Sequence, residues 1–309
     1  MAGGRRQPDR DRRHGPGRDV RGRDQGEPVS TIPATVAVIG GGTMGAGIAH
    51  VFLAAGSRVV LAEADADRAA AGAKAVEASL RKAEERGKLT TTADALLTGL
   101  STVDKLGDLP ADTALAVEAV PEKLDLKRSV LGEIADTCPD AVLASNTSSL
   151  SITELAAGLP GDRVIGMHFF NPVPVQTLVE LVHHAGLSAE VVAKVRGWAE
   201  ALGKTVIEVR DSPGFATSRL GVGVGLEAIR MVEEGVASPE DIDTGMRLGY
   251  GWPMGPLRLT DLVGLDVRLS IAEHLARELG DRFTPPQLLR DKVARGELGR
   301  KSGQGFFTW

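Results

Sequence analysis

Short apolar runs alternate with helical patterns over the first two thirds of the chain. The runs are rich in Val, Ile, Leu and Ala, a composition typical of strands buried on both faces of a sheet. Helix-forming residues fill most of the gaps, above all the Ala-, Glu- and Lys-rich stretch 65–86. The expected strands are 36–39, 58–63, 115–120, 141–145, 164–168, 177–182 and 205–209. This alternation predicts a mostly parallel, doubly wound α/β sheet with helices on both faces.

The pattern changes at residues 211–214, where the sequence Asp-Ser-Pro-Gly interrupts regular structure. Only helical patterns follow, at 215–235, 239–248, 256–278 and 286–296. Ser238 is suited to cap the second of these helices, with Pro239 at its first position. We therefore expect an α/β domain over 34–212 and an all-α domain over 213–309.

Residues 1–30 differ in composition from the rest of the chain. They are rich in Arg, Gly, Asp and Pro, and eight arginines against five acidic residues give the segment a charge of +3. It has too little apolar surface to offset the conformational entropy lost on folding, so we expect a disordered tail. No apolar core follows the charges, which argues against a signal peptide.

The overall composition excludes several classes of function. The 309 residues are 42% hydrophobic and 25% charged, as in globular proteins, and the net charge of −5 argues against a nucleic-acid partner. No apolar run approaches the roughly 20 residues of a membrane helix, so no membrane partner is expected. Cys138 is the only cysteine, which excludes an internal disulfide and a cysteine metal cluster and favours the reducing cytoplasm.

A glycine motif follows the first expected strand and opens a helix. Gly40, Gly42 and Gly45 have the spacing Gly-x-Gly-x-x-Gly, with Thr43 and Met44 inside the turn. The first glycine permits the tight turn, the second lets a pyrophosphate approach the backbone, and the third lets helix and strand pack closely. The helix N-terminus adds free N–H groups and a positive dipole. The motif predicts a Rossmann-type dinucleotide site.

Glu63 ends the second expected strand, about 20 residues after the glycines, where this motif has an acidic residue. A carboxylate there accepts hydrogen bonds from ribose hydroxyls and repels a 2′-phosphate, so the predicted cofactor is NAD rather than NADP. Arg58 does not reverse this preference, because it lies at the other end of the strand. The alternative is that Glu63 is an ordinary solvated acid at a strand end.

A histidine lies at the end of another expected strand. The run His168-Phe-Phe-Asn-Pro-Val-Pro174 contains two prolines, which force a reversal, and the return strand carries Glu180. The reversal is expected to bring His168 and Glu180 together. A carboxylate on one imidazole nitrogen fixes the tautomer and leaves the other nitrogen free to exchange a proton with a substrate. The alternative, a structural histidine in an apolar run, is disfavoured by the nucleotide motif upstream.

From about Val36 to Trp309 the chain resembles the short-chain L-3-hydroxyacyl-CoA dehydrogenases, particularly the bacterial 3-hydroxybutyryl-CoA dehydrogenases. The runs that carry the resemblance are 38–45, 144–150, 168–174, 211–215, 253–256 and 299–306. It implies reversible hydride transfer between NAD and C3 of a 3-hydroxyacyl-CoA, and a homodimer formed through the all-α domain.

The resemblance also implies roles for individual residues. His168 matches the family's general acid and base, Glu180 the carboxylate that orients it, and Ser148 the hydroxyl that meets the 3-oxygen of the substrate. Asn171 matches an amide that faces both cofactor and substrate. The further positions are Glu122, Lys127 and Lys301 beside NAD, and Ser79 and Arg86 beside CoA.

Two residues depart from the family pattern. Ser218 stands where the family usually has an Asn beside the acyl carbonyl, which affects the expected substrate or rate rather than the chemistry. Glu63 stands where Asp is common and keeps the charge, so the NAD preference is expected to survive.

Several of these residues have plainer interpretations. Ser148 could cap the helix expected near Ser151, Lys127 and Lys301 could be solvated lysines, and Arg86 could interact with a helix C-terminus.

Three rival functions also remain. The first is a dehydrogenase of a free hydroxy acid or an acyl-carrier-protein thioester. The second is a non-catalytic NAD-binding module, which would not need His168, Glu180 and Ser148 together. The third is the β-hydroxyacid dehydrogenases, whose base is a Lys; the His-Phe-Phe-Asn-Pro run argues against them.

Overall fold

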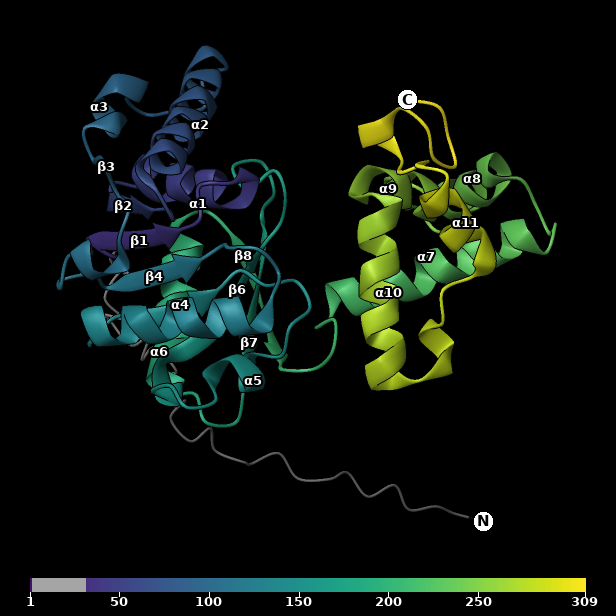
Figure 1. The fold of residues 1–309 in the computed structure, drawn as a ribbon. Helices are drawn as coiled ribbons and strands as arrows, with labels where there is room; N and C mark the ends of the chain where they lie inside the picture. Colours follow the sequence, from purple (N-terminus) through teal and green to yellow (C-terminus); the bar gives the residue numbers. More distant parts are fainter. Residues whose placement is uncertain (2–31) are drawn as a thin grey trace.

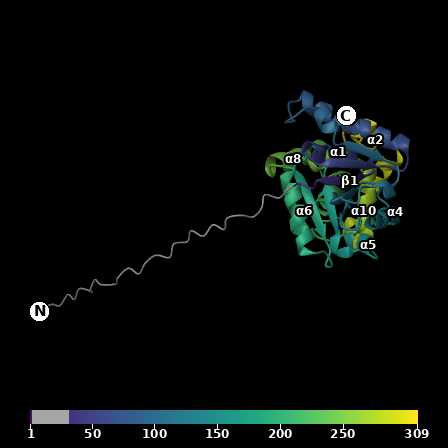
Figure 2. The same ribbon diagram turned by 90° about the vertical axis from the view of Figure 1, so that its left-hand side faces the viewer.

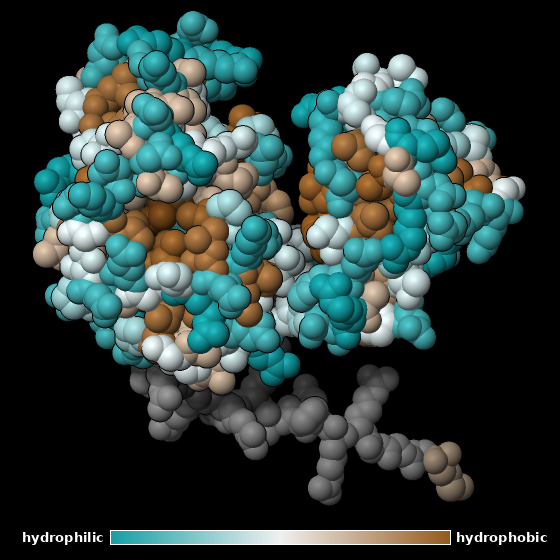
Figure 3. Space-filling view, viewed as in Figure 1, coloured by the Kyte–Doolittle hydropathy of each residue, from teal (hydrophilic) through white to brown (hydrophobic). Residues whose placement is uncertain are grey.

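The computed structural model describes Met1 and residues 32–309, so the tail expected over 1–30 lies, apart from Met1, outside the described residues. Figure 1 shows an α/β part on the left, which ends with β8, and a helical part on the right, which begins with α7. Figure 2 presents the α/β part in front of the helical part. On the face seen in Figure 3, hydrophobic side chains of the helical part gather on its side toward the α/β part.

One sheet organises the α/β part. Within the described residues its eight strands lie in the order β3-β2-β1-β4-β5-β6-β7-β8. The strands are β1 (Thr35–Ile39), β2 (Arg58–Ala62), β3 (Leu100–Val103), β4 (Leu115–Glu118), β5 (Val142–Ser145), β6 (Val164–Phe169), β7 (Leu178–His183) and β8 (Thr205–Arg210). All neighbours are parallel except β6 and β7, which are antiparallel. The mostly parallel sheet predicted from the sequence is confirmed.

Alternate side chains of the strands enter two separate cores. Val36 and Val38 of β1 belong to a core shared with four helices, and Ala37 and Ile39 to a core on the opposite face. The first core is covered by α1 (Thr43–Ala54), α2 (Ala66–Glu85), α3 (Ala93–Leu97) and α6 (Ala189–Ala201). The second is covered by α4 (Leu124–Thr137) and α5 (Ile152–Ala156). The sheet is therefore doubly wound, as its alternating pattern predicts.

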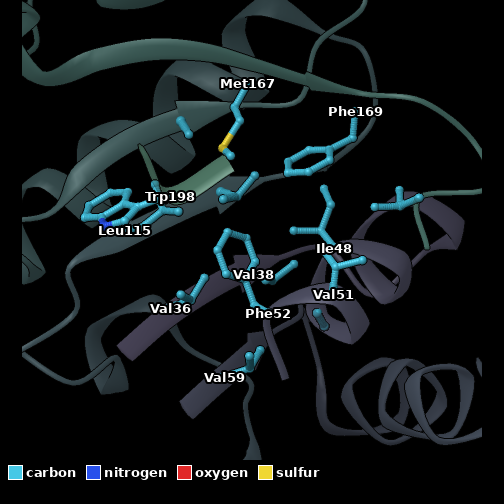
Figure 4. Packing of buried hydrophobic residues seen from close by; sticks show 14 of the residues in the cluster. Val36, Val38, Ile48, Val51, Phe52, Val59, Leu115, Met167, Phe169 and Trp198 are labelled. Atoms are coloured by element: carbon cyan, nitrogen blue, oxygen red, sulfur yellow. The ribbon is translucent and has the colours of Figure 1, made fainter. Parts of the chain in front are cut away.

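The packing of α1 fixes the start of the nucleotide motif. Figure 4 shows Ile48 and Phe52 of α1 against Val36, Val38 and Val59 of the sheet, and all five side chains are fully buried. Complete burial of such a side chain contributes roughly 1.5–3 kcal/mol. This contact holds the N-terminus of α1 at the carboxyl end of β1, where β1 and β4 are neighbours and the chain order of the sheet reverses.

The helical part begins after the Pro-Gly pair of residues 213 and 214. Its helices are α7 (Thr217–Glu233), α8 (Pro239–Gly249), α9 (Pro256–Val263), α10 (Leu265–Leu279) and α11 (Gln287–Ala294). The predicted cap is confirmed, because the Ser238 hydroxyl accepts a hydrogen bond from the Asp241 N–H at 3.1 Å. The single helix predicted over 256–278 was wrong. Gly264 has φ +106° and separates α9 from α10, a backbone conformation that favours glycine.

Two elements had no sequence signal. The edge strand β3 has the sequence Leu-Ser-Thr-Val with its two central residues exposed, so it lacks the apolar run that marks the buried strands. The short helix α3 spans little more than one turn and therefore shows no helical period. In both cases the structure follows from contacts with neighbouring elements rather than from local pattern.

A buried carboxylate attaches the C-terminal segment to α9. Asp261 accepts hydrogen bonds from the N–H groups of Phe306 and Phe307, each at 2.8 Å, and from Nε1 of Trp309 at 2.9 Å. Gly305 permits this close approach, because a Cβ there would lie 2.2 Å from Asp261 Oδ1. Phe306 and Phe307 thereby complete the core of the helical part.

Asp261→Asn is expected to destabilise the protein, although the two side chains are nearly equal in size. In the wild type these N–H donors face carboxylate oxygens. In the variant one of those oxygens is replaced by an NH₂ group, which cannot accept their hydrogen bonds. The free energy of unfolding should therefore fall by about 2–4 kcal/mol. Urea unfolding followed by circular dichroism measures the change. Asp281→Asn, at an exposed position, is the matched control and should stay within about 0.5 kcal/mol of the wild type. Equal stability of the two variants would contradict the role given to Asp261.

Candidate active site

The glycine-rich turn has the geometry that a dinucleotide requires. Gly40 has φ +98°, and a Cβ there would lie 2.9 Å from the carbonyl oxygen of Ala119. A Cβ on Gly45 would lie 1.7 Å from the Gly40 carbonyl oxygen, so only glycine allows this contact between helix and strand. Gly42, in contrast, has nothing within 4 Å of an added Cβ, and no side chain caps α1. The turn is therefore open at the point where a pyrophosphate would approach.

Glu63 lies against the same turn. Its Oε1 accepts a hydrogen bond of 2.6 Å from the N–H of Gly41. The side chain is thus held next to the glycines, which disfavours the interpretation as an ordinary solvated acid. Arg58, at the opposite end of β2, pairs with Asp112 on the surface at 2.7 Å. Arg58 is therefore engaged away from the turn that Glu63 contacts.

The structure brings His168 and Glu180 together, as the reversal predicts. The two residues are direct neighbours in the antiparallel pairing of β6 and β7. Nδ1 of His168 lies 2.7 Å from Oε2 of Glu180, and both side chains are buried. Among the described residues no hydrogen bond engages the other ring nitrogen, Nε2, and His168 lines a cavity.

Glu180 also holds the first turn of the helical part. Its Oε1 accepts hydrogen bonds from the N–H groups of Ala216 and Thr217 at 3.2 and 3.0 Å, and its Oε2 accepts one from Thr217 Oγ1 at 2.7 Å. Burial alone raises the pKa of Glu180 and is the largest effect. The hydrogen bonds from His168 and Thr217 together nevertheless hold the pKa of Glu180 below its ordinary value. Glu180 is therefore an acceptor at neutral pH, and the shared proton resides on His168 Nδ1.

A second group of charges, centred on the buried Lys127, lies beside the same cavity. Nζ of Lys127 bonds both carboxylate oxygens of Glu118, at 2.9 and 3.0 Å, and lies 3.3 Å from Glu122. Lys127 is only 1% exposed, so its interpretation as a solvated lysine was wrong. Its charge is balanced inside the protein, and this anchors the loop that carries Glu122.

Glu122 orders the segment that carries Ser148. Its Oε1 accepts hydrogen bonds from Thr147 Oγ1 at 2.5 Å and from the N–H of Ser148 at 3.1 Å. Burial raises the pKa of Glu122, but Lys127 and these donors outweigh it, and the pKa lies below its ordinary value. The helix α5 is capped by Ser151, whose hydroxyl accepts from the Glu154 N–H. The alternative role of Ser148 as a helix cap was therefore wrong.

One cavity of about 570 Å³ joins these groups. Such a volume is typical of small-molecule sites. Its lining includes the predicted site residues Met44, Glu122, Lys127, Ser148, His168, Asn171 and Ser218. The helical part supplies the opposite wall, with Val222, Leu259, Val263, Val267, Arg268 and Ile271. The two parts of the chain thus form the cavity together.

Several predicted residues do not line this cavity: those of the glycine turn other than Met44, Glu63 beside the turn, Glu180 behind His168, and the three residues Ser79, Arg86 and Lys301. Ser79 Oγ lies 2.8 Å from Nδ1 of His50, where α1 meets α2. Arg86 is exposed at the C-terminus of α2, and Lys301 pairs with Asp266 at 2.6 Å on the surface of the helical part. The structure does not bring these three residues together with His168, so their proposed contacts with CoA or NAD stay predictions.

Two further residues of the site were missed from the sequence. Thr217 binds Glu180 through both its backbone and its hydroxyl. Asn146 fixes the strand that carries His168, because its Oδ1 accepts from the N–H of Phe169 at 3.0 Å. The only sequence signal for Thr217 was its place between the Pro-Gly-Phe run and Ser218.

Glu180→Gln is expected to weaken the junction of the two parts in a pH-dependent way. Charge-assisted hydrogen bonds contribute about 1.5–3 kcal/mol each, so the free energy of unfolding at pH 7 should fall by about 2 kcal/mol. Because the folded-state pKa of Glu180 lies below the ordinary 4.5, its contribution is present above that pH and disappears as the pH falls through the folded pKa. Urea unfolding between pH 7 and pH 3 measures the difference.

The matched control is Glu278→Gln, at an exposed position of α10, which should leave stability unchanged within about 0.5 kcal/mol. A wild-type advantage over Glu180→Gln that grows toward acid pH would contradict this assignment.

Comparison with known proteins agrees with this geometry. Residues 35–212 match the family model described as 3-hydroxyacyl-CoA dehydrogenase, NAD binding domain, and residues 214–309 match the C-terminal domain of the same family. A probable 3-hydroxybutyryl-CoA dehydrogenase of Deinococcus radiodurans is 44% identical over 88% of this chain and 99% of its own length.

Two further relatives extend the comparison. The 3-hydroxyadipyl-CoA dehydrogenase of Escherichia coli is 40% identical over 89% of this chain and 59% of its own length. The crystal structure of FadB2 from M. tuberculosis superposes with a TM-score of 0.85 at 42% identity, covering 90% of this chain and 99% of that one. The chain belongs to the 3-hydroxyacyl-CoA dehydrogenase family.

Proposed function

We propose that this protein is an NAD-dependent oxidoreductase that interconverts (S)-3-hydroxyacyl-CoA, such as 3-hydroxybutyryl-CoA, and 3-oxoacyl-CoA. The observation that carries the proposal is the His168–Glu180 pair, of which His168 lines a cavity together with Met44 of the glycine-rich turn and residues of the helical part. A carboxylate-bound histidine beside a dinucleotide turn is suited to move a proton while a hydride is transferred.

His168 is the proposed general base in the oxidation direction. Its Nδ1 proton is engaged by Glu180, so Nε2 accepts the proton of the 3-hydroxyl as the C3–H bond breaks and the C3–O bond becomes a carbonyl. The negative charge of Glu180 stabilises the imidazolium that forms. In reduction, the same imidazolium returns the proton to the developing alkoxide. Ser148 lines the same cavity and is the proposed hydrogen-bond partner of the 3-oxygen.

NAD, when bound, supplies the acceptor for the hydride that leaves C3. The residues proposed to hold it are Gly40, Gly42, Thr43, Met44, Gly45, Glu63, Glu122, Lys127, Asn171 and Lys301. The open approach at Gly42 and the carboxylate of Glu63 beside Gly41 support this assignment. The same carboxylate would repel a 2′-phosphate, which supports NAD over NADP.

The thioester is proposed to lie between the two parts of the chain. Ser218 lines the cavity on the side of α7 and is the proposed hydrogen-bond partner of the acyl carbonyl, with a shorter reach than the amide of Asn. Ser79 and Arg86 are proposed to contact CoA beyond the cavity. The relatives are named for substrates with a four-carbon acyl chain and with a six-carbon chain that ends in a free carboxylate.

A homodimer formed through the helical part is the proposed assembly. Most of the large hydrophobic side chains that are exposed among the described residues belong to this part: Leu220, Val236, Leu248, Tyr250, Val263, Val267 and Trp309. Apolar surface of this kind is typical of subunit contacts. The cytoplasm is the proposed compartment, because the single cysteine is buried as a free thiol. No helix of the described residues is long and apolar enough to cross a membrane.

The test of the proposed function is consumption of NADH by the purified chain with acetoacetyl-CoA. We expect turnover with NADH and the thioester, and at least about tenfold less with NADPH or with free acetoacetate. His168→Ala should lower kcat by about 10²–10⁴ while the Kd for NADH changes little, since a placed proton-transfer group contributes that order. His183→Ala, at the end of β7 and outside the cavity lining, is the matched control. Wild-type turnover in His168→Ala would refute the assignment of the base.

Leu248→Glu is expected to dissociate the proposed dimer. Leu248 is 78% exposed at the end of α8, so a carboxylate there would not disturb the core but would be costly in an apolar contact. Sedimentation at micromolar concentration should give twice the chain mass for the wild type and the chain mass for the variant. Leu126→Glu, on the α/β part, should remain dimeric. A monomeric wild type would contradict the proposal.

A further inference from the structure

Arg268 is a buried cation that lacks an anion. The residue lies on α10 and is only 5% exposed. Among the described residues, no carboxylate forms an ion pair with its guanidinium, and its Nε has no hydrogen-bond partner. Buried arginines are almost always paired, because removing an isolated charge from water costs several kcal/mol. The guanidinium of Arg268 is therefore free to bind an anion from outside the chain.

Arg268 stays charged in spite of this cost, because the ordinary pKa of a guanidinium is high. Burial lowers its pKa to about 10, and no neighbouring acid opposes the shift. At neutral pH the side chain is thus still a cation. The partner that Arg268 lacks is an anion. The hydroxyl of Thr260 also has no hydrogen-bond partner among the described residues, and both side chains lie close to Gly225 of α7.

Arg268 faces the cavity that contains His168. It belongs to the lining of this cavity together with Ser218 and Gly221 of α7. Ser218, Gly221 and Gly225 lie at helical spacing on one face of α7. A Cβ on Gly221 would lie 3.6 Å from Nη1 of Arg268, an ordinary contact distance, so the guanidinium lies directly beside α7 at this residue. Gly221 is three residues from Ser218, so the guanidinium lies about one turn, roughly 5 Å, farther along α7.

The wall between Ser218 and Arg268 is hydrocarbon. Val222, Leu259 and Ile271 line the cavity on this side, and no acidic side chain of the helical part does. A chain of methylene groups fits such a wall, and a carboxylate at its far end fits the guanidinium, which binds carboxylates with two parallel hydrogen bonds. The phosphates of CoA are the other anions of the substrate, but the pantetheine arm separates them from the thioester.

We propose that Arg268 binds a carboxylate at the far end of the acyl chain, so that this enzyme acts on 3-hydroxydicarboxylyl-CoA thioesters. The inference rests on the proposed function and names the substrate class for the same cavity. Arg268 determines specificity and takes no part in the proton or hydride transfer.

The test compares two thioesters of equal chain length, 3-hydroxyadipyl-CoA and 3-hydroxyhexanoyl-CoA, which differ by a carboxylate in place of a methyl group. We expect the wild type to oxidise the dicarboxylic thioester with the higher kcat/KM. In Arg268→Met, kcat/KM for 3-hydroxyadipyl-CoA should fall at least about 30-fold, since loss of one partner of a buried charge pair has an effect of this order. Turnover of 3-hydroxyhexanoyl-CoA should stay the same or rise.

Two controls separate recognition from folding. Arg277→Met removes an exposed arginine of the same helix and should leave both substrates unchanged. Arg268→Met itself should melt no lower than the wild type, because it replaces an unpaired buried charge by an apolar chain of similar length. Arg268→Lys should retain part of the preference for the dicarboxylic thioester.

The outcomes also distinguish this inference from the proposed function. Good turnover of 3-hydroxyhexanoyl-CoA, with no advantage for 3-hydroxyadipyl-CoA and no effect of Arg268→Met on their ratio, overturns the role of Arg268 and leaves the proposed function standing. If neither thioester is oxidised, the proposed function fails. Calorimetric binding of 3-hydroxyadipyl-CoA to the wild type and to Arg268→Met then still decides whether Arg268 binds the carboxylate.

Discussion

The carboxylate of Glu180 makes hydrogen bonds on both sides of the junction between the two parts of the chain. On the side of the sheet it accepts a hydrogen bond from Nδ1 of His168. On the side of the helical part it accepts hydrogen bonds from two N–H groups and one hydroxyl at the start of α7. A buried carboxylate is tolerated only when such donors surround it. The orientation of the histidine and the position of α7 therefore have one common origin, and the cavity between the two parts keeps its shape because of it.

The two parts contribute different properties to the cavity. The α/β part supplies the groups assigned to the chemistry, which lie at the ends of β6 and β7 and in the loops after β4 and β5. The helical part supplies a mostly hydrocarbon wall whose polar residues are Thr217, Ser218 and Arg268. Substitutions in α7, α9 and α10 can therefore alter the preferred acyl chain while the proton-transfer pair remains intact.

Much of the fold and of the candidate site was predictable, because it depends on the pattern of residues that are neighbours in the sequence. The buried strands, the glycine turn and the reversal that joins His168 to Glu180 depend on runs of neighbouring residues. The burial of Lys127, the bonds from Thr217 and the isolation of Arg268 were not predictable. The first two depend on contacts with residues that are distant in the sequence. The third depends on the absence of an acidic partner for Arg268 among the described residues. The break at Gly264 was missed because apolar spacing continues across it, and only the backbone reveals the positive φ.

The antiparallel pairing of β6 with β7 has a consequence for protein engineering. Because side chains alternate faces along a strand, a slip of one residue would carry Glu180 to the opposite face of the sheet. The hairpin over 164–183 thus fixes the alignment of His168 with Glu180 through its own register. It could not be grafted alone, however. Without the start of α7, its carboxylate would keep only the imidazole as a partner, and a recipient scaffold would have to provide a helix N-terminus at the same place.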